Sequence, residues 1–444
     1  MMESRDELQQ LPEHLRKYVQ RARWRQSREN YWTRGRFEAQ APDPAHEERV
    51  RWFREGRCGL MMHMGLYTVL GRNEWAVIKE GIPWDEYEAL ADRWRPREGV
   101  ADEWLSDAAA MGARYAIFST KHHEGFCLWD TETTDFNSAA RGPGRDFVAE
   151  YVKACRRRDI RVGLYFSLWD VHHPATERAR EDESARRELV DYTHAQIEEL
   201  CTRYGRIDLL WYDVPKPLNP DGWEHETINS NVREWQPGIL INDRMGVPGD
   251  FATQDFGVRP DQELTPGEPC RDWEVAFPVN GKWLYNEQAQ RDCMSLRTVL
   301  RILAETTAHV GAMAVNVGPK PDGSFPAAAR GRLHELGRWL ARYGEAVYGP
   351  KERVLGRLPA TGLGQWTLEG KTAYLWLFEW PGPGWAITNF APEVERATLL
   401  PEGPEVTVRH EDGRVVFPAL PVPEPDPETG VAIIKLELAE ELEL

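Results

Sequence analysis

A group of reactive side chains follows directly on an apolar, β-branched run. The segment ARYAIFST, residues 113–120, is succeeded by Lys121, His122, His123 and Glu124. Neighbouring residues of a strand face opposite sides, so both imidazoles can reach one ligand only if the strand ends there, and Gly125 permits such a bend. Because an imidazole donates from one nitrogen and accepts at the other, the pair favours hydrogen bonding to the hydroxyls of a sugar.

A carboxylate stands at the end of another apolar run. The segment DLLWYD ends at Asp213, which could act as an ionised nucleophile or, in a structural role, as a helix cap or a loop ion pair. If the reaction is cleavage of a glycosidic bond, a second carboxyl group must protonate the leaving oxygen. Asp255, Glu274 and Glu74 are the candidates for that group, and their spacing in the sequence does not choose among them.

A metal centre is the main alternative use of these residues. It would take His63, His122 or His123, and Asp213 as ligands. Barrel hydrolases that bind zinc commonly offer two histidines one residue apart on the first strand, whereas this chain has HMG at 63–65. We therefore expect no metal, and the hydrolytic chemistry requires no other cofactor.

The elements that must position these residues alternate along the chain. Apolar, strand-like runs at 58–65, 113–120, 161–170, 207–213, 239–244 and 311–319 are separated by amphipathic helical segments. Continuous apolar strands between helices indicate a parallel sheet that is covered on both faces. Polar residues stand at the carboxyl end of each strand. This arrangement favours a (β/α)₈-like TIM barrel, whose strand ends converge on one mouth, over an open doubly wound sheet.

The character of the sequence changes after the helical segment 329–349. Short β-type segments separated by proline and glycine turns follow to the end of the chain. We predict a catalytic (β/α)₈-like barrel with a helical N-terminal lead-in over residues 1–350, and an antiparallel β-sandwich over residues 351–444.

Composition excludes several classes of function. The 444 residues carry a net charge of −17, which argues against nucleic-acid binding, because neutralising phosphates needs clustered cations. No run approaches the ~18 apolar residues needed to cross a membrane. The six cysteines form no CxxC pair, and the polar first residues show no signal-peptide pattern, so we expect a cytoplasmic protein. The sequence is compatible with a homo-oligomer and leaves the oligomeric state open.

Nine blocks of the sequence resemble the α-L-fucosidases of glycoside hydrolase family 29, in the same order, from about Trp52 to Tyr348. They are WFREGRCGLMMHMGLYTV, RNEW, MGARYAIFSTKHHEGFCLWDTETTDFNS, GPGRDFVAEYVKACRRRDIRVGLYFSL, DLLWYD, INDR, WEVAF with WLYN, NVGPKPDGSFP and GRWLARYGEAVYG. The fold of that family, a (β/α)₈-like barrel followed by a β-sandwich, agrees with the pattern of segments described above.

The resemblance implies a retaining exo-α-L-fucosidase that acts on fucosylated oligosaccharides through a covalent fucosyl-enzyme. It implies that Asp213 is the nucleophile. As the acid/base it favours Asp255, with Glu274 as the second choice. The sugar-binding residues of the family fall on His63, Glu74, Trp75, His122, His123, Tyr165, Trp211 and Arg244.

Three departures from the family pattern qualify these expectations. Met64 follows His63 where the family has tryptophan, so one aromatic wall of the pocket is missing or is supplied elsewhere. Val214 and Pro215 follow the nucleophile where glycine is common, and Asp255 stands where glutamate is frequent. Another L-sugar substrate, such as an α-L-galactoside, and a catalytically inactive sugar-binding barrel are the remaining alternatives.

Overall fold

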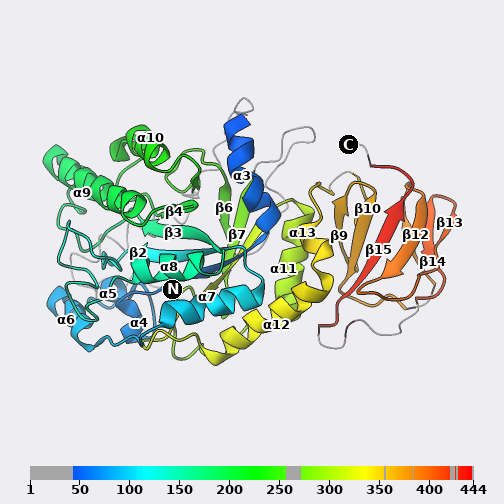
Figure 1. The fold of residues 1–444 in the computed structure, drawn as a ribbon, viewed down its shortest axis with the longest axis horizontal. Helices are drawn as coiled ribbons and strands as arrows, with labels where there is room; N and C mark the ends of the chain where they lie inside the picture. The colour runs from blue at the N-terminus through cyan, green and yellow to red at the C-terminus, as the bar shows by residue number, and fades with distance from the viewer. Residues whose placement is uncertain are drawn as a thin grey trace, which may run out of the picture.

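The computed structural model describes residues 44–256, 272–354, 357–382, 384–420, 426 and 429–442. Within them, an eight-stranded parallel sheet curls around a central core, and antiparallel sheets follow at the C-terminal end (Figure 1). Residues 1–43, which make up most of the predicted N-terminal lead-in, and most of the proline-rich stretch after residue 420 lie outside the described residues.

The large sheet is the predicted barrel. Its strands are β1 (Cys58–Met62), β2 (Tyr115–Lys121), β3 (Arg161–Ser167), β4 (Leu209–Asp213), β5 (Leu240–Ile241), β6 (Ala252–Asp255), β7 (Trp273–Pro278) and β8 (Ala312–Val317). They lie in the order β5-β4-β3-β2-β1-β8-β7-β6, and every paired neighbour is parallel. A single parallel bridge between Asn242, which follows β5, and Phe251, which precedes β6, brings the two edges of the curled sheet together.

Helices surround the sheet. They are α3 (Pro44–Gly56), α4 (Tyr67–Leu70), α5 (Ala76–Lys79), α6 (Trp84–Glu88), α7 (Val100–Met111), α8 (Phe147–Arg156), α9 (Glu183–Thr202), α10 (His225–Trp235), α11 (Leu296–Ala308), α12 (Ala327–Tyr343) and α13 (Glu345–Tyr348), with short 3₁₀ turns at Ala91–Arg93 and Asp221–Trp223. Several begin at an N-cap side chain that accepts from the first-turn amides, namely Asp146, Asp182 and Ser295. Residues 242–251 connect β5 to β6 without a helix, which departs from a regular (β/α)₈ pattern.

The C-terminal strands form two antiparallel sheets with their own apolar core. The strands are β9 (Gly364–Glu369), β10 (Thr372–Leu377), β11 (Trp385–Thr388), β12 (Val394–Leu399), β13 (Arg409–Glu411), β14 (Arg414–Phe417) and β15 (Ala432–Leu438). One sheet has the order β12-β15-β10-β9 and the other β11-β14-β13. Helices α11 to α13 lie between the barrel and these sheets (Figure 1). The predicted fold class is therefore confirmed. No described helix has the length and apolarity that a bilayer span requires.

Helix α3 covers the amino-terminal end of the barrel. Its apolar side chains Val50 and Phe53 pack into the barrel interior beside Phe251. Its polar side chains meet two buried carboxylates, Asp250, two residues before β6, and Asp272, directly before β7. The polar contacts around these two carboxylates come from His46, Arg49, Arg54 and Arg233.

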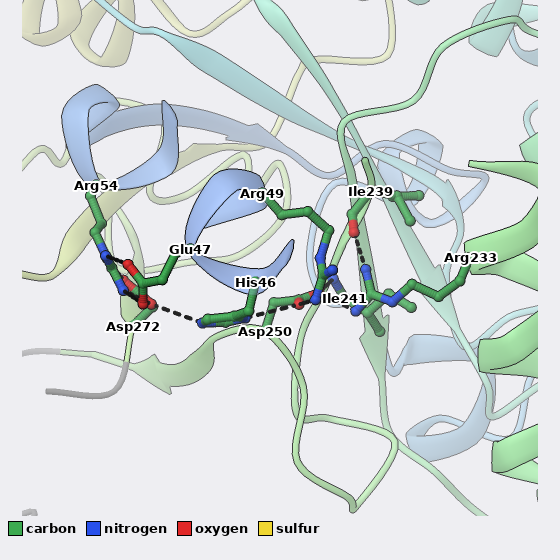
Figure 2. Close-up of polar contacts among 9 residues, drawn as sticks. All are labelled: His46, Glu47, Arg49, Arg54, Arg233, Ile239, Ile241, Asp250 and Asp272. Atoms are coloured by element: carbon green, nitrogen blue, oxygen red, sulfur yellow. Dashed lines mark hydrogen bonds and ion pairs between the residues drawn. The ribbon is translucent and has the colours of Figure 1, made fainter. Parts of the chain in front are cut away.

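Figure 2 shows His46 between the two carboxylates. Its Nδ1 lies 3.3 Å from Oδ1 of Asp250, and its Nε2 lies 3.3 Å from Oδ2 of Asp272. Hydrogen bonds to both carboxylates raise the pKa of His46 from 6.5 to about 9. A charged imidazole thus joins the loops that precede β6 and β7 to the helix that closes the barrel.

The stability of the protein should therefore depend on pH through His46. Because the folded pKa is above the unfolded value of 6.5, the protonated form contributes stability that is fully present below pH 6.5 and is lost as pH rises through about 9. We expect His46→Gln to lower the melting temperature at pH 6 and to have much less effect at pH 9.5. Thermal unfolding followed by circular dichroism measures this difference.

The matched control is His410→Gln, at an exposed histidine of β13. It should shift the melting temperature equally little at both pH values. If His46→Gln lowers the melting temperature as much at pH 9.5 as at pH 6, the result would contradict a charged role for His46.

Candidate active site

Asp213 is the last residue of β4, and its carboxylate lies among polar groups at the carboxyl end of the barrel. The Tyr165 hydroxyl donates to Oδ2 at 2.6 Å, and Nη1 of Arg244 donates to Oδ1 at 3.1 Å. The residue is 8% exposed. Both oxygens are thus held in place, and the predicted nucleophile lies at the barrel mouth rather than in a peripheral ion pair.

The surroundings of Asp213 keep it ionised. Burial alone raises its pKa, but the positive charge of Arg244 and the hydrogen bond from Tyr165 outweigh burial, and the net pKa is below the usual 3.8. A carboxylate that is negative at neutral pH and largely shielded from water can attack an electrophilic carbon.

Arg244 connects this carboxylate to a second one. Its Nη2 donates to Oδ1 of Asp255, the last residue of β6, while its Nε donates to the Thr253 hydroxyl at 2.7 Å. The side chain of Asp255 is 28% exposed, so it faces the opening. The guanidinium lies 4.2 Å from the centre of the Trp211 ring, which supports it from below. One cation therefore holds both candidate catalytic carboxylates.

His63, which follows β1, is fixed in one tautomer by its neighbour. Its Nδ1 lies 2.7 Å from Oδ1 of Asn316, which can only accept, so Nδ1 carries the proton and Nε2 is free to accept. Burial lowers the pKa of His63 to about 4, so the ring is neutral at physiological pH. The site thus offers a hydrogen-bond acceptor here rather than a positive charge.

The two adjacent histidines after β2 also face the site, as predicted. Nδ1 of His123 lies 2.7 Å from the Ser167 hydroxyl, which itself donates to a backbone carbonyl, so this nitrogen donates and Nε2 points to Asp213 at 3.9 Å. Burial lowers the pKa of His123 to about 4 and that of His122 well below 6.5, so neither is a cation at neutral pH. Nδ1 of His122 is buried and lacks a hydrogen-bond partner in the described structure.

A bulge and a glycine allow both histidines to face the same site. The pairing of β2 with β3 shifts between Ser119 and Lys121, which leaves Thr120 as an extra residue. Gly125 adopts φ = 84°, and a β-carbon there would lie 2.4 Å from an oxygen of Asp170. The predicted bend is confirmed.

The other polar residues of this segment support the loops instead of lining the site. Lys121 is fully buried and pairs with Asp170 at 3.2 Å. Glu124 accepts from the backbone amides of Leu66 and Tyr67, in the loop after β1. Of the four polar residues in KHHE, only the two histidines line the candidate site.

Aromatic side chains form the rim of the site. The Trp75 ring lies 4.7 Å from the ring of His123 and 5.2 Å from that of Trp169, with Glu74 beside it in the sequence. The Trp283 ring, from the loop after β7, lies 5.8 Å from that of His63. Met64, by contrast, is 1% exposed and packs in the core. Trp283 is thus an aromatic neighbour of His63 at the rim, whereas Met64 contributes to the core.

Glu274 occupies a different level of the barrel. It lies near the start of β7, is 0% exposed, and accepts from the Tyr115 hydroxyl at 2.5 Å and from Nε1 of Trp211 at 2.9 Å. Burial raises its pKa to about 7. Both oxygens of Glu274 therefore accept hydrogen bonds inside the barrel, which favours Asp255 over Glu274 as the acid/base.

Substitution of Glu274 should therefore affect stability more than chemistry. Glutamine keeps an acceptor and a donor, and the Tyr115 hydroxyl can rotate to accept, so Glu274→Gln should retain turnover within about fivefold, equally for good and poor leaving groups. Glu274→Ala leaves two buried donors unpaired and should destabilise the protein by about 1–3 kcal/mol for each. Chemical denaturation and kinetics with aryl glycosides of graded leaving-group acidity measure both effects. A loss confined to poor leaving groups in Glu274→Gln would restore the acid/base role.

Val214, directly after the nucleophile, has an unusual backbone conformation. Its φ is 43°, in the left-handed region that β-branched residues rarely adopt. The family resemblance implies a glycine at Val214 or Pro215, and glycine is the residue that adopts a positive φ most easily. Such strain beside a catalytic residue costs roughly 1–3 kcal/mol and persists only where the surroundings enforce it.

Asn316, Ser167 and Trp283 contribute to the site but were not among the predicted site residues. Asn316 stands near the end of an apolar strand, so its position gave a usable signal, whereas Ser167 and Trp283 carried none. Among the described residues, the side chains of His, Cys, Asp and Glu form no group of three or more suited to a metal ion.

Comparisons with known proteins agree in sequence and in fold. The family model described as alpha-L-fucosidase matches residues 25–345. Tissue alpha-L-fucosidase of Bos taurus is 28% identical over 375 residues, which cover 79% of each chain. Plasma alpha-L-fucosidase of Pongo abelii is 30% identical over 67% of this chain and 69% of its own.

Two solved structures extend the comparison to nearly the whole chain. Alpha-L-fucosidase isoenzyme 1 from Paenibacillus thiaminolyticus has a TM-score of 0.81 at 30% identity, and covers 89% of this chain and 100% of its own. A GH29 alpha-L-fucosidase from Bacteroides thetaiotaomicron, trapped as a covalent intermediate with 2-fluoro-fucosyl fluoride, has a TM-score of 0.80 at 26% identity. It covers 92% of this chain and 99% of its own.

Proposed function

The chain belongs to the alpha-L-fucosidase family, glycoside hydrolase family 29, and from this premise we propose that it is a retaining exo-α-L-fucosidase. Its substrates would be fucosylated oligosaccharides or glycoconjugates, from which it removes a terminal α-L-fucosyl residue. The observation that carries this proposal is the ionised Asp213 at the barrel mouth, joined through Arg244 to the partly exposed Asp255.

In the first step, an oxygen of Asp213 attacks the anomeric carbon while the bond from that carbon to the leaving oxygen breaks. Asp255, as the acid, gives its proton to the leaving oxygen. In the second step, water attacks the anomeric carbon, its proton passes to Asp255, and the bond to Asp213 breaks. The close placement of two carboxyl groups on one guanidinium supports a retaining geometry, and the trapped covalent intermediate of the Bacteroides thetaiotaomicron relative supports the same pathway.

The remaining polar groups would bind the sugar ring. Nε2 of His63 is free to accept from a hydroxyl, and the unpartnered Nδ1 of His122 offers a further hydrogen-bonding position. Neutral imidazoles suit the uncharged hydroxyls of fucose, because their desolvation costs less than that of cations. The rings of Trp75 and Trp283 flank this group on two sides and would cover the apolar parts of the sugar.

The configuration of the first-formed product tests the proposal. Hydrolysis of an aryl α-L-fucoside followed by proton NMR should show α-L-fucose before mutarotation. Initial release of β-L-fucose would exclude the retaining mechanism, and no release at any pH would exclude the enzymatic function. An aryl α-L-galactoside in a parallel reaction measures how strictly the site requires the methyl group of fucose.

A further inference from the structure

A hollow of ≈ 240 Å³ opens beside the candidate active site, between the loops that follow β1 and β7. The first loop contributes Arg72, Glu74 and Lys79, and the second contributes Lys282 and Trp283. Two of these residues connect the hollow to the sugar-binding group. Trp283 contacts His63, and Glu74 precedes Trp75, whose ring packs on His123.

The two loops are joined directly to each other. The backbone amide of Glu287 donates to the carbonyl of Gly71 at 2.7 Å, and the side-chain amide of Asn286 donates to the carbonyl of Arg72 at 2.7 Å. These bonds fix the second loop against the first. The hollow is therefore a preformed feature of the barrel mouth, with its lining residues held at a set spacing.

Cations predominate in the hollow, although the whole chain has a net charge of −17. Arg72 pairs with Glu80, so its charge is partly compensated. Lys79 and Lys282 are exposed, and neither forms an ion pair within the described part of the chain. Lys79 lies 5.8 Å from the centre of the Trp75 ring, so its charge is close to the sugar-binding group.

An exposed aromatic ring adjoins Trp283, which lines the hollow. Phe256, the residue after Asp255, is 53% exposed and packs edge-on against Trp283 at 5.3 Å. An exposed aromatic face next to the acid/base candidate suits the apolar face of a pyranose ring. The combination of a ring surface and two exposed ammonium groups, against the single carboxylate of Glu74 in the lining, suits a sugar that carries a negative charge.

We propose that this hollow is a subsite for the sugar next to fucose, and that it selects aglycones bearing a sulfate or carboxylate group. The inference rests on the proposed function, because it assigns the leaving-group side of the same reaction. Lys282 and Lys79 supply the charge, while Trp283 and Phe256 contact the ring.

The test measures kcat/KM for three aryl α-L-fucosides whose aglycones are neutral, sulfonated and carboxylated. The three leaving groups differ in acidity, so absolute rates are not compared. The measured quantity is kcat/KM for each anionic substrate divided by kcat/KM for the neutral one, and this ratio is compared between wild type and variants. Lys282→Met should lower this ratio about threefold, and Lys79→Met with Lys282→Met about tenfold, at low ionic strength. The ratio of the wild-type enzyme should fall as salt is added.

The matched control is Lys153→Met, an exposed lysine on α8, which removes the same charge from a different surface. It should leave the ratio at the wild-type value. Equal ratios in wild type and the double variant, with the neutral fucoside still cleaved, would overturn the subsite alone. A fall for only the sulfonated or only the carboxylated substrate would identify which acidic group is selected. Failure to cleave any of the three would overturn both the proposed function and this inference.

Discussion

Replacing Asp213 by glycine is expected to lower kcat for an aryl α-L-fucoside on the order of 10⁴-fold. The carboxylate is the ionised group at the barrel mouth, held by Tyr165 and Arg244, and glycine leaves room for a small anion in its place. Added azide should therefore restore part of the activity. Because azide would attack from the face that Asp213 occupied, the product should be β-L-fucosyl azide, with inverted configuration, identified by NMR.

The matched control is Asp208→Asn, at the other buried carboxylate near β4. Asp208 lies at the amino-terminal end of that strand, where it pairs with Arg161 and Arg206. Asp208→Asn should lower the stability of the protein, and added azide should not raise the activity of this variant. Near-normal turnover of Asp213→Gly, or loss of activity that azide leaves unchanged in well-folded protein, would contradict the assignment of the nucleophile.

Replacing Asp255 by alanine is expected to separate substrates by leaving group. A general acid contributes about 10²–10⁴-fold, so hydrolysis of a fucosyl disaccharide should fall by that factor. A fucoside of 2,4-dinitrophenol needs little protonation, and its first step should be much less affected. Steady-state kinetics across a series of aryl fucosides gives the dependence on leaving-group acidity.

Azide distinguishes this variant from the nucleophile variant. In Asp255→Ala, azide would attack the covalent intermediate, and the product should be α-L-fucosyl azide, with retained configuration. When Glu274→Gln is measured with the same series of aryl fucosides, its loss of activity should not depend on the acidity of the leaving group. An equal loss for all leaving groups in Asp255→Ala would assign the acid/base role to another residue.

The position of the site could be predicted from the sequence because of one property of parallel barrels. Carboxyl ends of all strands meet at one mouth, so a polar residue at the end of an apolar run is placed there without knowledge of the rest. This reasoning located His63, His122, His123, Asp213 and Arg244 in one group, which the structure confirms.

Glu274 could not be placed by the same reasoning. The segment WEVAF gave no boundary for β7, and an apolar run does not reveal whether a neighbouring carboxylate stands at its start or its end. In the structure Glu274 lies near the start, one barrel layer below the mouth. Its partners, Tyr115 and Trp211, are distant in sequence, so the pairing depended on the three-dimensional arrangement.

The protonation states of the histidines could likewise not be predicted from the sequence. Each ring is set by a neighbour from another strand, Asn316 for His63 and Ser167 for His123. Whether an imidazole accepts, donates or carries a charge follows from such contacts and from burial. Residue type alone predicted sugar hydrogen bonding at this place, and the contacts specify which nitrogen is available.

In the proposed mechanism, the guanidinium of Arg244 would stabilise the two carboxylates in turn. Asp255 is protonated at the start of that mechanism, so Asp213 is the negative partner of the cation until the first half-reaction converts its carboxylate into an ester. The full attraction of the cation then falls on Asp255, which has just given up its proton and is needed as an anion to activate water. Release of the sugar would regenerate the Asp213 anion while Asp255 regains a proton, so the attraction would return to Asp213. A single fixed charge would thus reset the enzyme at each turnover, without any movement of the backbone.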